Sequence, residues 1–165
     1  MKVVLDTNVL VSGIFFSGPP AAILKAWSRG KIRLLVSPEI LDEYRRVSEE
    51  LSGKFPDVDI QPILDLIVVH SEVCDPPSLP LPVCEDPSDD KFLSVVIETR
   101  TKIIVSGDKH LLRVSGYQGI SVLTPRRSSF GIFLVSNRSM TFSRSNHRLE
   151  LTAALRESVR PRSSA

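Results

Sequence analysis

Short apolar runs alternate with longer amphipathic stretches along the first 125 residues of the chain. The runs have the length of strands, and those without polar alternation are typical of strands covered on both faces of a parallel sheet. They lie at residues 3–5, 32–36, 102–105 and 120–123, with a shorter and less apolar candidate at 72–74. The stretches between them predict helices over residues 8–16, 20–27, 37–51 and 57–70, and from residue 88 onward. The pattern predicts an α/β fold.

Asp6 directly follows the first predicted strand, and Asp108 follows the strand at 102–105 after a short turn. In open α/β sheets the ligand crevice lies at the carboxyl ends of the strands. A carboxylate buried there is costly unless it is paired or functional. Asp6 therefore has two interpretations: a functional group, or a cap for the helix that begins near Asn8.

The helix predicted from residue 37 carries one acid near its buried side. At about 100° per residue, Glu43 lies about 70° from the centre of the apolar stripe, at the rim of the packed face. It can point into a crevice or pair in solvent with Arg45 or Arg46. The stripe itself consists of Ile40, Tyr44, Val47 and Leu51.

Ser88 is the predicted N-cap of the next helix, whose first turn contains two acids. On the wheel, Asp89 falls on the centre line of the buried face and Asp90 lies about 90° away, at its rim. This geometry favours Asp90 as the acid that faces a crevice, with Asp89 as the alternative.

At 165 residues, with 42% apolar and 24% charged residues, the chain is typical of one globular domain. No apolar run approaches the ~20 residues that span a bilayer, and no signal-peptide pattern opens the chain. Cys74 and Cys84 lack metal-site spacing and are expected to be reduced thiols. We expect a cytoplasmic protein without a membrane segment.

Charge divides the chain into two parts. Residues 1–125 contain 13 basic and 17 acidic residues, a net charge of −4, whereas residues 126–165 contain eight arginines and two glutamates, a net of +6. We predict an α/β domain over residues 1–125 and an atypical Ser/Arg-rich tail over 126–165. Three interpretations of the tail remain open: a disordered segment, a basic arm that attracts RNA, or a frame-shifted or read-through C-terminus.

Asp6, Glu43, Asp90 and Asp108 come from two strand ends and two helices that can meet at one edge of the sheet. Four converging carboxylates repel one another unless a cation lies between them. Oxygen ligands without histidine or cysteine favour Mg²⁺ or Mn²⁺. Such ions activate water and bridge phosphodiesters, which points to metal-dependent phosphodiester hydrolysis.

Four motifs in this order resemble those of the PIN-domain nucleases, and more narrowly the VapC-like toxin branch, over about residues 2–125. They are Val-Leu-Asp-Thr-Asn-Val at 4–9, Ser37-Pro38 with Glu43, Asp86-Pro87-Ser88-Asp89-Asp90 before Lys91-Phe92-Leu93, and Val105-Ser106-Gly107-Asp108 before Leu111-Leu112. The resemblance implies a three-layer α/β/α sandwich with a four- to five-stranded parallel sheet. It also implies a Mg²⁺- or Mn²⁺-dependent endoribonuclease that cuts single-stranded RNA to leave a 5′-phosphate and a 3′-hydroxyl.

The same resemblance assigns roles to individual residues. Asp6, Glu43, Asp90 and Asp108 match the family's catalytic, metal-holding acids, with Asp89 in place of Asp90 if the alignment shifts by one. Asp86 is an additional metal-site acid, and Asn8 and Ser106 would orient the carboxylates or a water. The implied partners are RNA, an antitoxin protein and a second copy of the chain.

Two other functions remain open from the sequence. A catalytically silent PIN-fold module would bind RNA or an antitoxin without cutting. A haloacid-dehalogenase-like phosphatase needs a second aspartate two residues after the first, where this chain has Asn8. Beside Asp108, three basic residues either contact RNA phosphates or form a solvated rim: Lys109, His110 and Arg113.

Overall fold

The computed structural model describes residues 1–128 and builds them around a five-stranded parallel sheet of order β3-β2-β1-β4-β5. The central strand β1 has three fully buried apolar residues, as its unbroken apolar run predicted. The strands are β1 (Lys2–Leu5), β2 (Arg33–Val36), β3 (Glu72–Val73), β4 (Ile103–Val105) and β5 (Ser121–Leu123).

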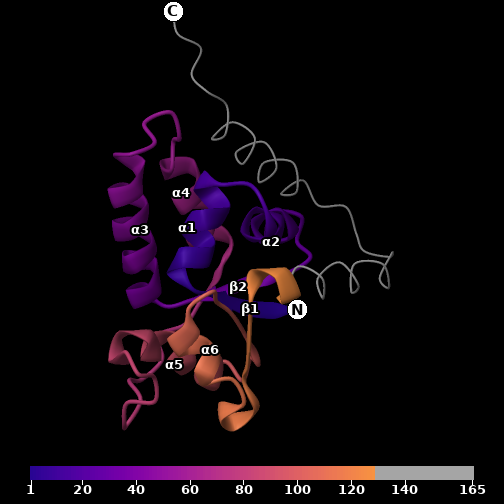
Figure 1. Ribbon diagram of the computed structural model, residues 1–165, viewed down its shortest axis with the longest axis vertical. Helices are drawn as coiled ribbons and strands as arrows, with labels where there is room; N and C mark the ends of the chain where they lie inside the picture. The colour runs from indigo at the N-terminus through magenta and orange to yellow at the C-terminus, as the bar shows by residue number, and fades with distance from the viewer. Residues whose placement is uncertain (129–165) are drawn as a thin grey trace, which may run out of the picture.

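Helices cover both sides of this sheet, so the predicted three-layer α/β/α architecture is confirmed (Figure 1). Four helices lie on one side of β1 and β2: α1 (Thr7–Phe15), α2 (Pro19–Ser28), α3 (Pro38–Ser52) and α4 (Gln61–His70). Two lie on the other: α5 (Asp90–Glu98) and α6 (Lys109–Arg113). Two 3₁₀ turns, η1 (Pro87–Asp89) and η2 (Tyr117–Gly119), precede α5 and β5.

Local sequence signals explain how the helices begin and pack. The Ser37 hydroxyl accepts the Ile40 N–H at 3.2 Å, which caps α3 in front of Pro38. Gly13 brings α1 close to α2, since a Cβ there would lie 2.9 Å from the Pro20 carbonyl oxygen. The sequence therefore encodes both the helix start and the close α1–α2 contact.

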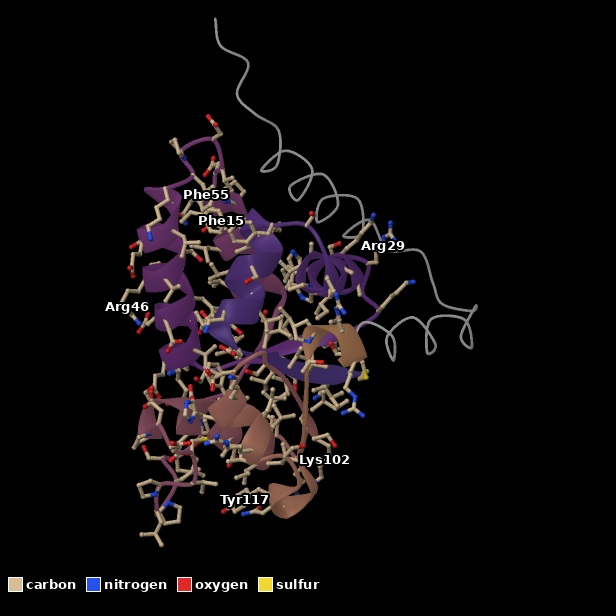
Figure 2. The ribbon with its side chains drawn as sticks, in the orientation of Figure 1. Phe15, Arg29, Arg46, Phe55, Lys102 and Tyr117 are labelled. Atoms are coloured by element: carbon tan, nitrogen blue, oxygen red, sulfur yellow. The ribbon has the colours of Figure 1, made fainter. Side chains whose placement is uncertain are left out.

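Three phenylalanine rings pack together between α1 and the segment that follows α3. Trp27 is buried, so core packing accounts for it. The rings of Phe15 and Phe55 lie 5.4 Å apart, where the end of α1 meets the segment after α3 (Figure 2). The Phe16 ring meets Phe55 edge to face at the same distance.

Two predicted helix starts are wrong. The helix expected from residue 57 begins at Gln61, with its proline in the first turn as required. Ser88 is not a helix N-cap, because the Asp86 carboxylate accepts the Ser88 N–H at 2.9 Å and forms the cap of η1. The α-helix then starts at Asp90.

Cys74 and Cys84 are both free thiols. Among residues 1–128 no single helix is long and apolar enough to cross a membrane. The bent pair α1 and α2 has the required length and apolar composition only when the two helices are counted together. The Ser128 N–H donates to the Thr124 carbonyl at 3.0 Å, so a hydrogen-bonded turn continues past residue 125. The rest of the predicted tail lies outside the described residues.

Candidate active site at the carboxyl ends of β1 and β4

Asp6 lies where the order of the sheet reverses, because the chain adds β2 and β3 on one side of β1 and β4 and β5 on the other. Its backbone N–H donates to the Val105 carbonyl at 2.9 Å and joins the end of β1 to the end of β4. Asp6 is only 5% exposed. A buried carboxylate therefore occupies the position where open α/β sheets form their ligand crevice.

Both oxygens of the Asp6 carboxylate are held. Oδ1 accepts the Asn8 N–H at 3.1 Å and caps α1, while Oδ2 accepts the Ser106 hydroxyl at 2.5 Å. Ser106 Oγ in turn accepts the Asp108 N–H at 2.9 Å. Ser106 is fully buried and thus fixes Asp6 relative to the loop that carries Asp108.

Burial and neighbouring negative charges raise the pKa values of two acids at this edge, Asp6 and Asp89. Burial raises the pKa of Asp6, and the negative charges of Asp108 and Glu43 add to that effect. The hydrogen bonds from Ser106 and Asn8 oppose it. Burial, followed by the charges of Asp6, Asp86 and Asp108, raises the pKa of Asp89 to about 6. Asp6, Asp89 and Asp108 therefore share one electrostatic environment, with Glu43 at its side.

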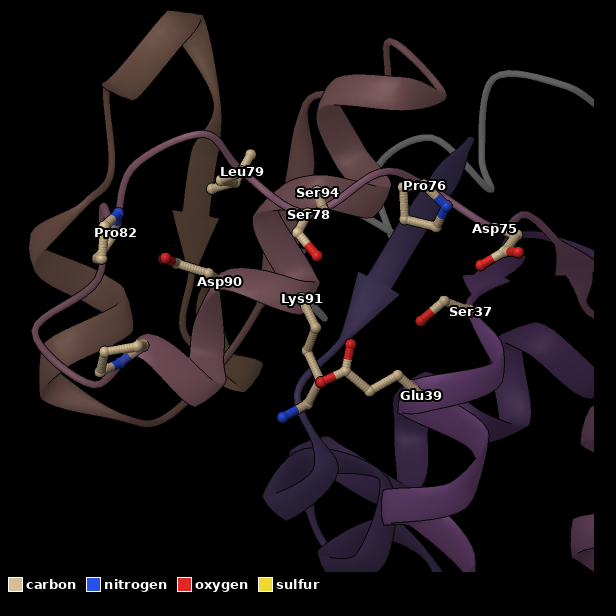
Figure 3. A pocket seen from close by; sticks show the side chains of 11 residues that line it. Ser37, Glu39, Asp75, Pro76, Ser78, Leu79, Pro82, Asp90, Lys91 and Ser94 are labelled. Atoms are coloured by element: carbon tan, nitrogen blue, oxygen red, sulfur yellow. The ribbon is translucent and has the colours of Figure 1, made fainter.

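Asp90 is not part of that group. Its carboxylate accepts the Cys84 N–H at 2.8 Å and the Val83 N–H at 3.1 Å. Figure 3 shows its side chain directed to the loop between Leu79 and Pro82 and away from Lys91. Of the two acids that the sequence left open, Asp89 feels the charge of Asp6, whereas Asp90 anchors a loop.

The helical wheel chose the other acid because it assumed one continuous α-helix from residue 88. The 3₁₀ turn at 87–89 changes the angular spacing in front of Asp90, so the wheel's 100° step does not apply to Asp89. The Asp86-Pro87-Ser88 sequence was the available signal, since an aspartate before proline favours a local turn.

Glu43 forms an ion pair that the sequence did not predict. Lys91 Nζ lies 2.5 Å from Glu43 Oε2, and the two side chains are 6% and 24% exposed, respectively. Lys91 Nζ also donates to the Ser88 carbonyl at 2.6 Å. Glu43 thus pairs with Lys91 in a contact between α3 and α5, whereas the alternative partner Arg45 lies 3.7 Å from Asp42.

Tyr44, the residue after Glu43, ties α3 to the same edge of the sheet. Its buried hydroxyl donates to the Leu5 carbonyl at 2.6 Å, directly before Asp6. Burial and the charges of Asp6 and Glu43 raise the pKa of Tyr44 well above its ordinary value. Tyr44 is therefore a neutral donor that sets the distance between α3 and the end of β1.

The exposed rim of the site combines acids with two of the three predicted basic residues. Asp108 caps α6 by accepting the His110 N–H at 2.7 Å. His110 Nδ1 and an Arg113 guanidinium nitrogen lie 2.5 and 2.7 Å from the same Glu85 oxygen. These contacts lower the pKa of Glu85 and raise the pKa of His110. His110 and Arg113 thus form part of an exposed ion cluster beside Asp108.

The donor chemistry of the site fits a hard divalent cation. The available ligands are carboxylate oxygens. Burial first, and neighbouring negative charges second, raise the pKa values of Asp6 and Asp89, and a cation would offset those charges. Within residues 1–128, however, no three acidic, histidine or cysteine side chains form a group that could hold an ion as they stand. Asp108 is engaged with the α6 amides and Glu43 with Lys91, so side-chain rotations would have to complete the site.

A pocket of about 250 Å³ has Lys91 in its wall (Figure 3). It opens between the start of α3, the proline-rich loop at 75–82 and α5, and Asp6, Asp89 and Asp108 do not line it. Its walls are formed by Ser37, Glu39, Asp75, Pro76, Ser78, Leu79, Pro82, Pro87, Asp90, Lys91 and Ser94.

Comparison with known proteins agrees with this geometry. The PIN domain family model matches residues 2–110, which include every acid described above. An uncharacterized protein of Methanocaldococcus jannaschii is 34% identical to this chain over 117 residues, which cover 68% of this chain and 74% of that protein.

Proposed function

Because the chain belongs to the PIN-domain family, we propose that it is a metal-dependent endoribonuclease that hydrolyses phosphodiester bonds of single-stranded RNA. The observation that carries this proposal is the Asp6 carboxylate. It is buried at the β1–β4 edge, and the negative charges of Asp108 and Glu43 act on it there. Negative charge concentrated at a strand-end crevice suits chemistry in which a cation and a phosphate meet.

We assign the ion-holding role to Asp6, Asp89 and Asp108, with Mg²⁺ or Mn²⁺ as the ion. When bound, that ion would supply positive charge to offset the phosphate's negative charge and to make a water more acidic. Ser106 holds Asp6 in place through its hydroxyl, and Asn8 does so through its backbone N–H. Asp86 and the His110–Arg113 rim flank the acids on the exposed side, where RNA would approach.

Incubation of the full chain with single-stranded RNA and, separately, single-stranded DNA tests the activity. With Mn²⁺ or Mg²⁺ we expect RNA fragments with 5′-phosphate and 3′-hydroxyl ends, and no cutting with EDTA. Cutting that persists in EDTA, or fragments with cyclic 2′,3′-phosphate ends, would contradict a metal-dependent mechanism.

The biological role that we propose is that of a toxin neutralised by an antitoxin protein in the cytoplasm, with a homodimer as the working form. The motifs shared with the VapC-like branch support this role. Induced expression of the wild type should arrest bacterial growth, while expression of Asp6→Asn should not. Equal growth with both proteins present at equal levels would contradict the toxin role.

A second candidate is a catalytically silent module that binds RNA or a protein partner. One observation favours it: among the described residues no three acids are grouped to hold an ion, and Lys91 already neutralises Glu43. This module would bind RNA equally well with Mn²⁺ or EDTA and leave the RNA intact in both.

A further inference from the structure

Lys91 is a buried cation among the acids of the candidate site. Its side chain is only 6% exposed, and its ammonium group contacts both Glu43 on α3 and the Ser88 carbonyl of η1. A lysine so far out of water is stable only when its charge is paired and its donors are used. These two contacts therefore fix the position of the positive charge.

The start of α5 sets this position. Asp90 is anchored to the amides of Val83 and Cys84, which orients the first turn of the helix. The next residue, Lys91, is rotated by about 100° and is directed to α3 rather than to that loop. Figure 3 shows the two side chains pointing in different directions.

Lys91 also acts on the other acids of the site. Its positive charge opposes the shift that raises the pKa of Asp89, and it helps to lower that of Asp86. Glu43, its partner, lies close enough to Asp6 to raise that pKa. The ammonium group thus pairs with Glu43 and acts by its charge on Asp89, one of the acids to which we assigned the ion.

We infer that Lys91 keeps Glu43 from acting as a metal ligand, because its ammonium group pairs with the Glu43 carboxylate. The site then binds one divalent ion, on Asp6, Asp89 and Asp108. The lysine ammonium occupies the place that a second ion would take beside Glu43. This inference rests on the proposed function and makes Lys91 a positioning residue. An alternative is that the Lys91–Glu43 pair only braces α3 against α5, in which case its removal would change stability but not the number of ions bound.

Calorimetric titration of the full chain with Mn²⁺, without RNA, separates these alternatives. We expect one Mn²⁺ per wild-type chain and two per Lys91→Met chain, because the freed Glu43 carboxylate becomes a ligand. Lys91→Arg keeps the charge and should bind one. Lys25→Met, which removes an exposed lysine on α2, is the matched control and should also bind one.

The double variant Lys91→Met/Glu43→Gln should return to one Mn²⁺, since the new ligand is then absent. Two ions on the wild type, or one on Lys91→Met with a Kd within twofold of the wild type, would overturn the inference and leave the nuclease proposal intact. Two ions on Lys91→Arg would also overturn it. No Mn²⁺ binding by the wild type would overturn both proposals. If thermal unfolding shows that Lys91→Met does not fold, Lys91→Gln is judged by the same criteria.

Discussion

The Asp6 carboxylate serves at once as the cap of α1 and as the buried acid of the sheet edge, two roles that sequence reasoning treated as alternatives. Its two oxygens are held by different partners, the Asn8 N–H and the Ser106 hydroxyl. Both contacts come from the protein itself and orient the carboxylate, as the residues behind a metal ligand commonly do.

Ser106→Ala should weaken this orientation. We expect Mn²⁺ affinity and RNA cleavage to fall by about tenfold or more, the range typical of lost supporting hydrogen bonds. The exposed Ser121→Ala on β5 is the matched control. Unchanged affinity in Ser106→Ala would show that Asp6 does not depend on the serine.

Mutation of Asp89 and mutation of Asp90 should have different effects on RNA cleavage and on stability. Asp89→Asn should abolish cleavage, because it removes an acid near Asp6. Asp90→Asn should retain cleavage but lower the free energy of unfolding by about 1–3 kcal/mol, because the Val83 and Cys84 amides lose a charged acceptor. The reverse pattern in cleavage assays and denaturant melts would restore Asp90 to the site.

The raised pKa of Asp89 makes the ion-free protein less stable as pH rises. The unfolded chain loses this proton near the ordinary value of 3.8 and the folded chain near 6, so stability declines between these values as pH increases. Because Asp89 is only partly buried, we expect only about 1 kcal/mol after screening. Denaturant melts in EDTA at pH 4.5 and 7 should show a smaller loss of stability for Asp89→Asn than for the wild type. An equal loss would contradict the assignment.

At the scale of elements, apolar runs predicted β1, β2, β4 and β5, because an unbroken apolar run marks a strand with buried residues without partner information. The exposed two-residue β3 corresponds only to the shorter and less apolar candidate at 72–74. Helix starts were less predictable where a turn precedes the helix, as at Asp86–Ser88. The Lys91–Glu43 pair was not predictable at all, because it joins α3 to α5 and depends on how two helices pack. Asp6 and Asp108 were found because strand ends can be read from local sequence.

The contact between α3 and β1 depends on Tyr44. Tyr44→Phe removes the hydrogen bond to the Leu5 carbonyl and leaves that buried oxygen with one donor fewer. We expect the free energy of unfolding to fall by about 1–2 kcal/mol in chemical denaturation. Tyr117→Phe on η2, where the ring is partly exposed, should change stability little. Equal effects from both substitutions would contradict the role of Tyr44.

For the whole molecule, the sequence predicts an acidic body and a basic tail, and the structure describes the body to Ser128. A matched pair of proteins, the full chain and a truncation after Ser128, tests the basic arm. The truncation keeps the Ser128 N–H donation to Thr124 and removes six arginines. RNA binding should depend less steeply on salt in the truncation, since each lost phosphate contact lowers the slope by about 0.7. Equal slopes, with both proteins folded by thermal melting, would rule out the arm.

We propose that the carboxylates at the β1–β4 edge make this chain a nuclease. The most direct measurement compares wild type, Asp6→Asn and the control Lys25→Met on one single-stranded RNA panel with Mn²⁺, Mg²⁺ or EDTA. We predict metal-dependent cutting by the wild type and the control, and none by Asp6→Asn at an unchanged fold. Cutting by Asp6→Asn at the wild-type rate, or no cutting by any of the three with either metal, would contradict the claim.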